Sequence, residues 1–197
     1  MSWLGIILTF SIVNNVVLGR LLGICPCISA PRSLRETLWI GLSMTALMSM
    51  AALAAWALES QIFGPLGIGY LRTPAFVLAV AGLTLIAQRM ASWVAPSALR
   101  AAGFTLPGIG INCATLGVAL IVSHGTYTAG QSLVAGLSAG AGFLLVLVLL
   151  GTIRERLDAE KVPRALEGLP IHLISAGLLA WVFLAFDRAF LIHILGR

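Results

Sequence analysis

Long runs of hydrophobic residues, separated by short polar segments, are the main pattern along this chain. Four stretches contain no Asp, Glu, Lys or Arg: residues 1–19, 37–58, 101–153 and 168–186. A helix that crosses the hydrocarbon core of a bilayer needs roughly 20 mostly apolar residues. The stretch 101–153 is long enough for two such crossings and the turn between them.

This pattern predicts six membrane-spanning helices. A further uncharged segment, residues 73–88, can be extended past Arg89, because a long basic side chain can reach the membrane interface while its stem stays in the apolar region. Helix-breaking Pro and Gly residues, together with polar residues, lie between the segments and are typical of turns. The predicted spans are 3–25, 37–58, 74–94, 102–122, 130–151 and 171–191. Close helix–helix contacts are expected at three small residues of the fifth span, Gly136, Gly140 and Gly142.

Composition excludes a water-soluble globular domain. Hydrophobic residues make up 59% of the chain, charged residues only 10%, and the mean hydropathy is +1.03. A soluble domain carries about 25% charged residues. We therefore expect an all-α integral membrane protein in which residues 1–197 form a single membrane domain.

The basic residues predict an orientation in the membrane rather than a nucleic-acid site, although the net charge is +5. With six spans, the first, third and fifth loops share one side and carry eight basic residues, against three on the other side. Basic loops stay in the cytoplasm, so both termini are expected on the opposite side of the membrane. No Lys or Arg precedes Arg20, so we expect no cleavable signal peptide. The eight basic residues of the first side are Arg32, Arg35, Arg89, Arg100, Arg154, Arg156, Lys161 and Arg164, and the three of the other side are Arg72, Arg188 and Arg197.

The two halves of the chain contain matching segments. Val13–Gly19 reads VNNVVLG and Ile111–Gly117 reads INCATLG, and the same shift carries the second span onto the fifth. The third and sixth spans share Ala-Gly-Leu at 81–83 and 176–178. An odd number of spans per copy inverts the second copy, and inverted repeats place their working site near the midplane on interrupted helices. We predict repeats of about 1–98 and 99–197.

The three Asn residues of the chain, Asn14, Asn15 and Asn112, all lie in the matched segments. A buried amide costs a few kcal/mol unless it is hydrogen-bonded. Such amides either join neighbouring helices or satisfy backbone groups that are freed where a helix unwinds. Pro107, Gly108 and Gly110 favour a break before Asn112. We predict that the first and fourth spans are interrupted near Asn14–Asn15 and Gly108–Asn112.

Cys25, Cys27 and Cys113 are the only cysteines. A free Cys often serves as a small buried hydrophobe, and a role as a metal ligand is the alternative. An iron–sulfur cluster usually takes four thiolates, so any such cluster here must be shared with another polypeptide. Inverted repeats also describe small-solute transporters, and a scaffold for soluble partners is a third interpretation. A midplane Cys without intramembrane carboxylates favours an electron carrier.

Several motifs resemble the A-type subunits of the Rnf electron-transport complexes, and the related NqrE subunit of sodium-pumping NADH:quinone reductases is similar. The resemblance runs from end to end of the chain. Cys27 and Gly110-Ile111 depart from the family pattern, which has an aromatic residue and Thr-Thr there. The motifs are Val13–Leu18 (VNNVVL), Leu22–Pro26 (LGICP), Tyr70–Thr73 (YLRT), Asn112–Leu120 (NCATLGVAL), Ile153–Leu157 (IRERL) and Ala176–Leu178 (AGL).

The resemblance implies a component of an ion-translocating ferredoxin:NAD oxidoreductase that is not catalytic alone. It implies a [2Fe–2S] cluster inside the bilayer, shared with the homologous and oppositely oriented E-type subunit, with Cys25 and Cys113 as this chain's ligands. The B-, C-, D- and G-type subunits complete the complex, and flavins and further clusters lie on these partners. An NqrE-type component remains the alternative.

A shared cluster requires a bent chain. Residues Asn15 to Cys25 in a continuous helix would span about 15 Å, at 1.5 Å per residue. Metal–sulfur bonds are about 2.3 Å, so thiolates of one small cluster lie within a few ångströms of each other. The interrupted first span is therefore a geometric requirement of the predicted cluster.

Overall fold

Every regular element in the described part of the chain is a helix. The computed structural model describes residues 3–13, 15–23, 34–64, 71–94, 112–125, 127–157, 163, 166 and 168–194. None of these residues lies in a strand. The predicted all-α class is therefore confirmed for this part of the chain.

Four long helices occupy the positions of predicted spans. They are α4 (Leu34–Leu58), α6 (Arg72–Val94), α9 (Ala129–Arg156) and α10 (Leu169–Ile194), and a π-helical turn, η2 (Glu59–Phe63), extends α4. Their bounds agree with the predicted spans 37–58, 74–94, 130–151 and 171–191 to within a few residues.

Two helical stretches are long and apolar enough, by length and composition, to cross a membrane: Thr37–Phe63 and Ala129–Ile153. Shorter apolar stretches cover Arg72–Ala87, Cys113–His124 and Pro170–Leu184. The described residues thus account for two full-length candidate spans and three partial ones.

The first predicted span is not one helix. It consists of α1 (Trp3–Leu8), a π-helical segment η1 (Thr9–Val13) and, after a break, α2 (Val16–Arg20). The predicted interruption near Asn15 is confirmed, but the predicted end at residue 25 is wrong for the helix, which stops at Arg20. Leu21 takes a left-handed conformation there, with φ of 54°, which a right-handed helix cannot continue.

The fourth predicted span, 102–122, is described only in its second part. Helix α8 runs from Cys113 to His124, and Asn112 before it is extended, with φ of −100° and ψ of 134°. Residues 95–111, including Pro107, Gly108 and Gly110, lie outside the described residues. The helix therefore begins at the end of the predicted interruption.

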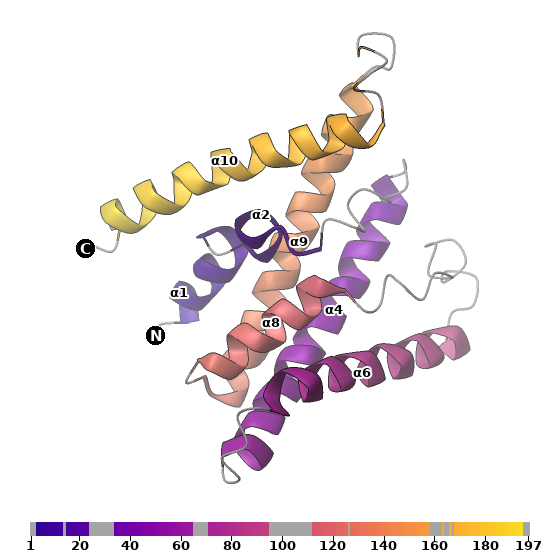
Figure 1. Cartoon of the computed structure of the whole chain (residues 1–197), viewed down its shortest axis with the longest axis vertical. Helices are drawn as coiled ribbons and strands as arrows, with labels where there is room; N and C mark the ends of the chain where they lie inside the picture. The colour runs from indigo at the N-terminus through magenta and orange to yellow at the C-terminus, as the bar shows by residue number, and fades with distance from the viewer. Residues whose placement is uncertain are drawn as a thin grey trace.

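The centre of the molecule is the pair α4 and α9, which run side by side (Figure 1). Gly136 and Gly140 on α9 face α4: an added Cβ would lie 2.6 Å from Ser49 Cα at the first position and 2.5 Å from Thr45 Cα at the second. No side chain fits at such distances, so the two backbones are in direct contact. This confirms the expectation that small residues mark helix–helix contacts.

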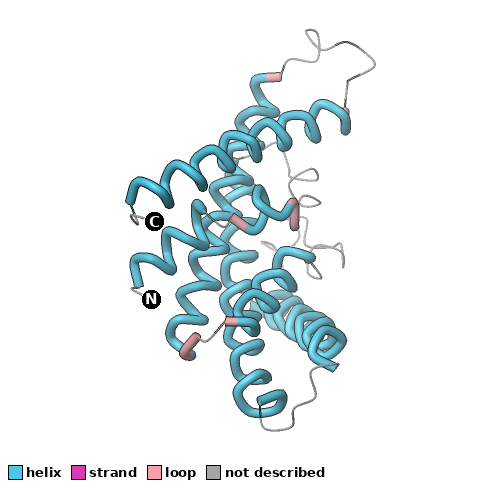
Figure 2. The backbone as a smooth tube through the Cα atoms, turned by 60° about the vertical axis from the view of Figure 1, so that its left-hand side comes forward, coloured by secondary structure: helices cyan, strands magenta, loops and turns pink. Residues whose placement is uncertain are grey.

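The other elements surround this pair in a regular way. Helix α8 packs against α4 and α6, while α1, η1 and α2 pack against α9, and η1 and α2 also against α10. Helices α6 and α10 lie on opposite sides of the central pair (Figure 1), and α1 starts on the side where α10 ends (Figure 2). If α2 is compared with α8, α4 with α9 and α6 with α10, the contacts of α8 with α4 and α6 correspond to those of α2 with α9 and α10.

A buried core joins the short helices to the central pair. It includes Val17, Met48, Val118 and Phe143, all with at most 1% of their surface exposed. In contrast, α6 and α10 present large apolar side chains outward, such as Leu78 at 73% and Trp181 at 77% exposed. Apolar faces of this extent favour contact with lipid or protein over water.

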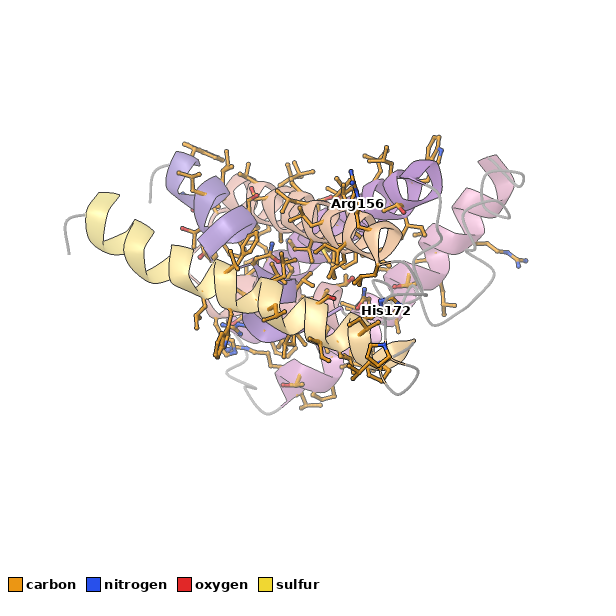
Figure 3. The ribbon with its side chains drawn as sticks, turned by 90° about the horizontal axis from the view of Figure 1, so that it is seen from above. Arg156 and His172 are labelled. Carbon is orange, nitrogen blue, oxygen red and sulfur yellow. The ribbon has the colours of Figure 1, made fainter. Side chains whose placement is uncertain are left out.

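The polar end of the molecule lies where α9 stops and α10 starts. Figure 3 labels Arg156, the last residue of α9, and His172, in the first turn of α10, at this end. The predicted polar loop, about 152–169, falls here, and residues 158–162, 164, 165 and 167 of it lie outside the described residues.

Candidate functional site

The break at Asn15 is held by the Asn15 side chain. Asn15 is 2% exposed and has an extended backbone, with φ of −60° and ψ of 117°. Its Oδ1 accepts a hydrogen bond from the Val17 N–H at 3.0 Å and so caps α2. Its Nδ2 donates to the carbonyl oxygens of Ser11 and Gly142, both at 3.2 Å. The bonds to Val17 and Ser11 serve backbone groups beside the break. The bond to Gly142 joins the break to α9, so the amide takes both of the roles expected for it.

Helix α2 ends in a tight reversal after five residues. Leu21 is left-handed, as is common just after a helix, and the Leu22 N–H donates to the Val16 carbonyl at 3.3 Å. Gly23 follows with φ of +87°, a conformation that L side chains rarely adopt. The reversal turns the chain back toward α8.

Gly23 lies directly against the start of α8. A Cβ added to Gly23 would be 2.9 Å from Ala114 Cβ and 3.1 Å from Phe143 Cε2. Gly117, one turn further along α8, faces Leu22 in the same way, with 2.7 Å to Leu22 Cδ1. The two broken segments of the predicted repeats therefore meet at this point.

The α8 start resembles the α2 start in its capping. Asn112 is 5% exposed, and its Oδ1 accepts from the Ala114 N–H at 3.2 Å. Both caps thus use the residue directly before the helix and the N–H two residues on. This pairing equates Asn15 with Asn112, one residue away from the gapless alignment, which pairs Asn14 with Asn112. The capping geometry, and not residue identity alone, therefore decides which residues of the two predicted repeats correspond.

The polar groups around Asn112 are incompletely paired. Asn112 Nδ2 and Thr115 Oγ1 are buried and have no hydrogen-bond partner among the described residues. Residues three apart lie on the same side of a helix. An unpaired buried donor costs about 1–3 kcal/mol. The start of α8 therefore has one amide and one hydroxyl group that make no hydrogen bond to the described residues.

Cys113 is the first residue of α8, and its side chain is exposed. The Gly23 N–H donates to Cys113 Sγ at 3.0 Å, and the thiol lies 3.5 Å from Asn112 Oδ1 as a donor. An exposed free thiol is unusual, because Cys is among the residue types that are most often buried. The arrangement joins the end of the first broken segment to the only cysteine among the described residues.

The other predicted site residues, Asn14, Cys25 and Cys27, lie outside the described residues. The structure brings together Asn112, Cys113 and Gly23, and places Asn15 at the other end of α2. The role of Gly23, inside the LGICP motif, was missed from the sequence. Gly142 was expected at a helix–helix contact, but not as the residue whose carbonyl accepts from Asn15. Their signal was the glycine itself, which permits backbone conformations and contacts that other residues do not.

A second polar group lies at the other end of the molecule. Arg72, at the start of α6, pairs with Glu59 of η2, and its NH1 lies 3.4 Å from His124 Nδ1 at the end of α8. This group ties three helix ends together. No cluster of three or more His, Cys, Asp or Glu side chains suited to a metal occurs in the part of the chain that the structure describes.

Comparison with known families decides the class of the protein. Residues 3–190 match the family described as "Rnf-Nqr subunit, membrane protein". The chain belongs to the Rnf-Nqr family. The expectation of a membrane protein, drawn from hydropathy, is thereby confirmed, and the family resemblance drawn from the short motifs is confirmed as well.

Individual Rnf-Nqr relatives cover nearly the whole chain. It is 40% identical over 187 residues to the A component of the Na(+)-translocating ferredoxin:NAD(+) oxidoreductase complex of Acetobacterium woodii, covering 95% of this chain and 97% of that protein. It is 41% identical over 175 residues to the A component of the ion-translocating oxidoreductase complex of Yersinia enterocolitica, covering 89% and 91%. The corresponding component from Yersinia pseudotuberculosis gives the same identity and coverage.

Proposed function

We propose that the chain is the A-type membrane component of an ion-translocating ferredoxin:NAD oxidoreductase, and that it relays electrons through a [2Fe–2S] cluster shared with a homologous subunit. The relatives' names support the complex. The contact between the Gly23 N–H and the exposed Cys113 thiol supports the relay. In this proposal the chain carries electrons and depends on other subunits for the chemistry at either end.

The residues around Cys113 fit an iron–sulfur ligand. The thiol is exposed, so a group on a neighbouring subunit can reach it. The 3.5 Å contact to Asn112 Oδ1 requires a protonated thiol and is lost when the sulfur becomes a thiolate ligand. The Gly23 N–H and the unpaired Asn112 Nδ2 are donors of the kind that surround cluster sulfurs.

Chain connectivity supports Cys25 as the second ligand. Cys25 follows Gly23 by two residues in the sequence, and two residues of extended chain span at most about 7 Å. Helix α2 ends at Arg20, so the 15 Å separation expected for a continuous helix does not arise. Two further thiolates must come from a partner, because four are usual and Cys27 departs from the family pattern.

The bound cluster would accept and donate one electron at a time. The chain holds Cys113 at the capped start of α8, next to a buried apolar core that includes Phe143 and Val118. Apolar surroundings exclude water from the thiolates and disfavour extra charge. The proposed partner at the cluster is the E-type subunit, and the flavins and other clusters are proposed on the remaining partners, of B, C, D and G type.

The proposed architecture is six spans in two inverted repeats, with the midplane at the two broken segments. The exchange symmetry of the helix contacts, α4 with α8 and α9 with α1, η1 and α2, supports it. The orientation follows from the basic loops, with both termini periplasmic in a bacterial inner membrane. A reporter fused at Arg197 that is active only in the cytoplasm would overturn this orientation.

The experiment that tests the relay is iron, acid-labile sulfide and EPR analysis of the purified complex. We expect Cys25→Ser and Cys113→Ser each to remove the reduced-cluster EPR signal of this site and to stop electron transfer from ferredoxin to NAD. Cys27→Ser is the matched control and keeps both. Full iron content and activity in both single variants would overturn the relay and show that these thiols bind no cluster.

A further inference from the structure

We propose that the Gly23 peptide N–H, donated to Cys113 Sγ, is a positioning group that raises the reduction potential of the cluster. This inference rests on the proposed function and concerns this chain's own residues. Gly23 is then required for the redox chemistry as well as for the turn.

The geometry singles out this N–H. Its nitrogen lies 3.0 Å from Cys113 Sγ, across 90 residues of sequence. Gly23 is buried, so water does not compete for the bond. A hydrogen bond in an apolar site is stronger than one in water. Reduction adds negative charge to a cluster and its thiolates, so an N–H donor stabilises the reduced state more than the oxidised state.

Only glycine brings the donor to this position. The φ of +87° is strained for any L side chain, and a Cβ would lie 2.9 Å from Ala114 Cβ, 3.1 Å from Phe143 Cε2 and 3.5 Å from Asn112 Oδ1. An alanine must therefore move away from α8 and carry its N–H with it. The donor distance to Cys113 Sγ increases as a result.

The first test is an EPR-monitored redox titration of the purified complex. Loss of a hydrogen bond to a charged group changes an equilibrium about tenfold. For one-electron reduction, a tenfold change corresponds to about 59 mV. We expect Gly23→Ala to lower the midpoint potential of this cluster by about 59 mV, with iron content retained.

Two further variants separate the redox role from packing. Gly136→Ala on α9 is the packing control, because its Cβ would meet α4, 2.6 Å from Ser49 Cα, and not the start of α8. The potential of this variant should equal that of the unmodified complex. Gly23→Ala combined with Ala114→Gly removes the closest obstructing atom, and should recover part of the lost potential. An unchanged potential in Gly23→Ala would overturn the proposal.

A measurement on the unmodified complex keeps the proposal testable if the variants fail to assemble. After selective ¹⁵N-glycine labelling, pulsed EPR should detect a peptide nitrogen coupled to the reduced cluster. Absence of any glycine nitrogen coupling would overturn the inference alone. Absence of cluster iron that depends on Cys113 would instead overturn the proposed function.

Discussion

The two helix breaks of this chain use the same residue type and leave it in different states. Asn15 is buried and fully hydrogen-bonded, since its Nδ2 donates to Ser11 and to Gly142 on α9. Asn112 is equally buried, but its Nδ2 has no partner among the described residues. Each Oδ1 caps the helix that follows.

The difference distinguishes a break whose side-chain bonds stabilise the fold from a break that lies at the proposed relay site. The Asn15 side chain joins η1 to α9 within the chain, so its bonds stabilise the fold. The Asn112 side chain stands beside an exposed thiol and retains unused donor capacity, which a group supplied from outside the described residues can satisfy. Local rules that are only partly satisfied tend to mark functional sites.

The largest expected effect comes from the same substitution at both breaks. Asn15→Leu removes three hydrogen bonds, among them the cap of α2 and the bond to α9, so we expect the free energy of unfolding to fall by about 3 kcal/mol. Asn112→Leu removes one capping bond and an unpaired donor, and should cost about 1 kcal/mol. SDS titration of the detergent-solubilised protein measures both, with Lys161→Ala as an unaffected control. Equal losses at the two positions would contradict the comparison.

A second prediction tests the anchor of the first break. A Cβ at Gly142 would lie 2.7 Å from the Ser11 carbonyl oxygen and 3.1 Å from Asn15 Nδ2, so Gly142→Ala must push η1 away from α9. We expect a loss of about 1–3 kcal/mol in unfolding free energy. Gly151→Ala on the same helix has nothing within 4 Å and should be neutral or stabilising. An equally large loss of unfolding free energy in Gly151→Ala would show that an alanine anywhere in α9 is destabilising. The contact between Gly142 and η1 would then not be the cause.

Removal of the unpaired Thr115 hydroxyl, close to Asn112, should have a smaller effect, and it should stabilise the protein. Thr115 is fully buried, and its Oγ1 has no partner among the described residues, so Thr115→Val should raise the unfolding free energy of the isolated protein by about 1 kcal/mol. Thr84→Val is the matched control, because Thr84 Oγ1 donates to the Val80 carbonyl at 2.7 Å and that bond is lost. Destabilisation by Thr115→Val would show that its hydroxyl is paired after all.

The smallest effect concerns the reversal after α2. Leu21 is 55% exposed and left-handed, so Leu21→Gly relieves backbone strain and should raise the unfolding free energy by up to about 1 kcal/mol. Leu38→Gly, at an exposed position inside α4, should instead cost about 1 kcal/mol. Thermal unfolding of the solubilised protein distinguishes the two signs. The same sign for both variants would argue against strain at Leu21.

Hydropathy alone located four of the helices, because an apolar run of about 20 residues has few alternatives in a bilayer. The pairing of polar and small residues also predicted the break at Asn15 and the close contacts at Gly136 and Gly140. The end of α2 at Arg20 was missed, since Leu21 is a poor residue for a left-handed position and the composition around it is apolar.

The sequence by itself determined the class of the protein, the family and the residue types at the two breaks. These properties depend on local composition and on short motifs, which a chain carries in any conformation. Only the tertiary structure decided that Gly23 donates to Cys113, that Gly142 accepts from Asn15 and that Asn112 keeps an unpaired donor. The first two contacts join segments far apart in the chain, and all three depend on how closely the helices pack and where each helix ends.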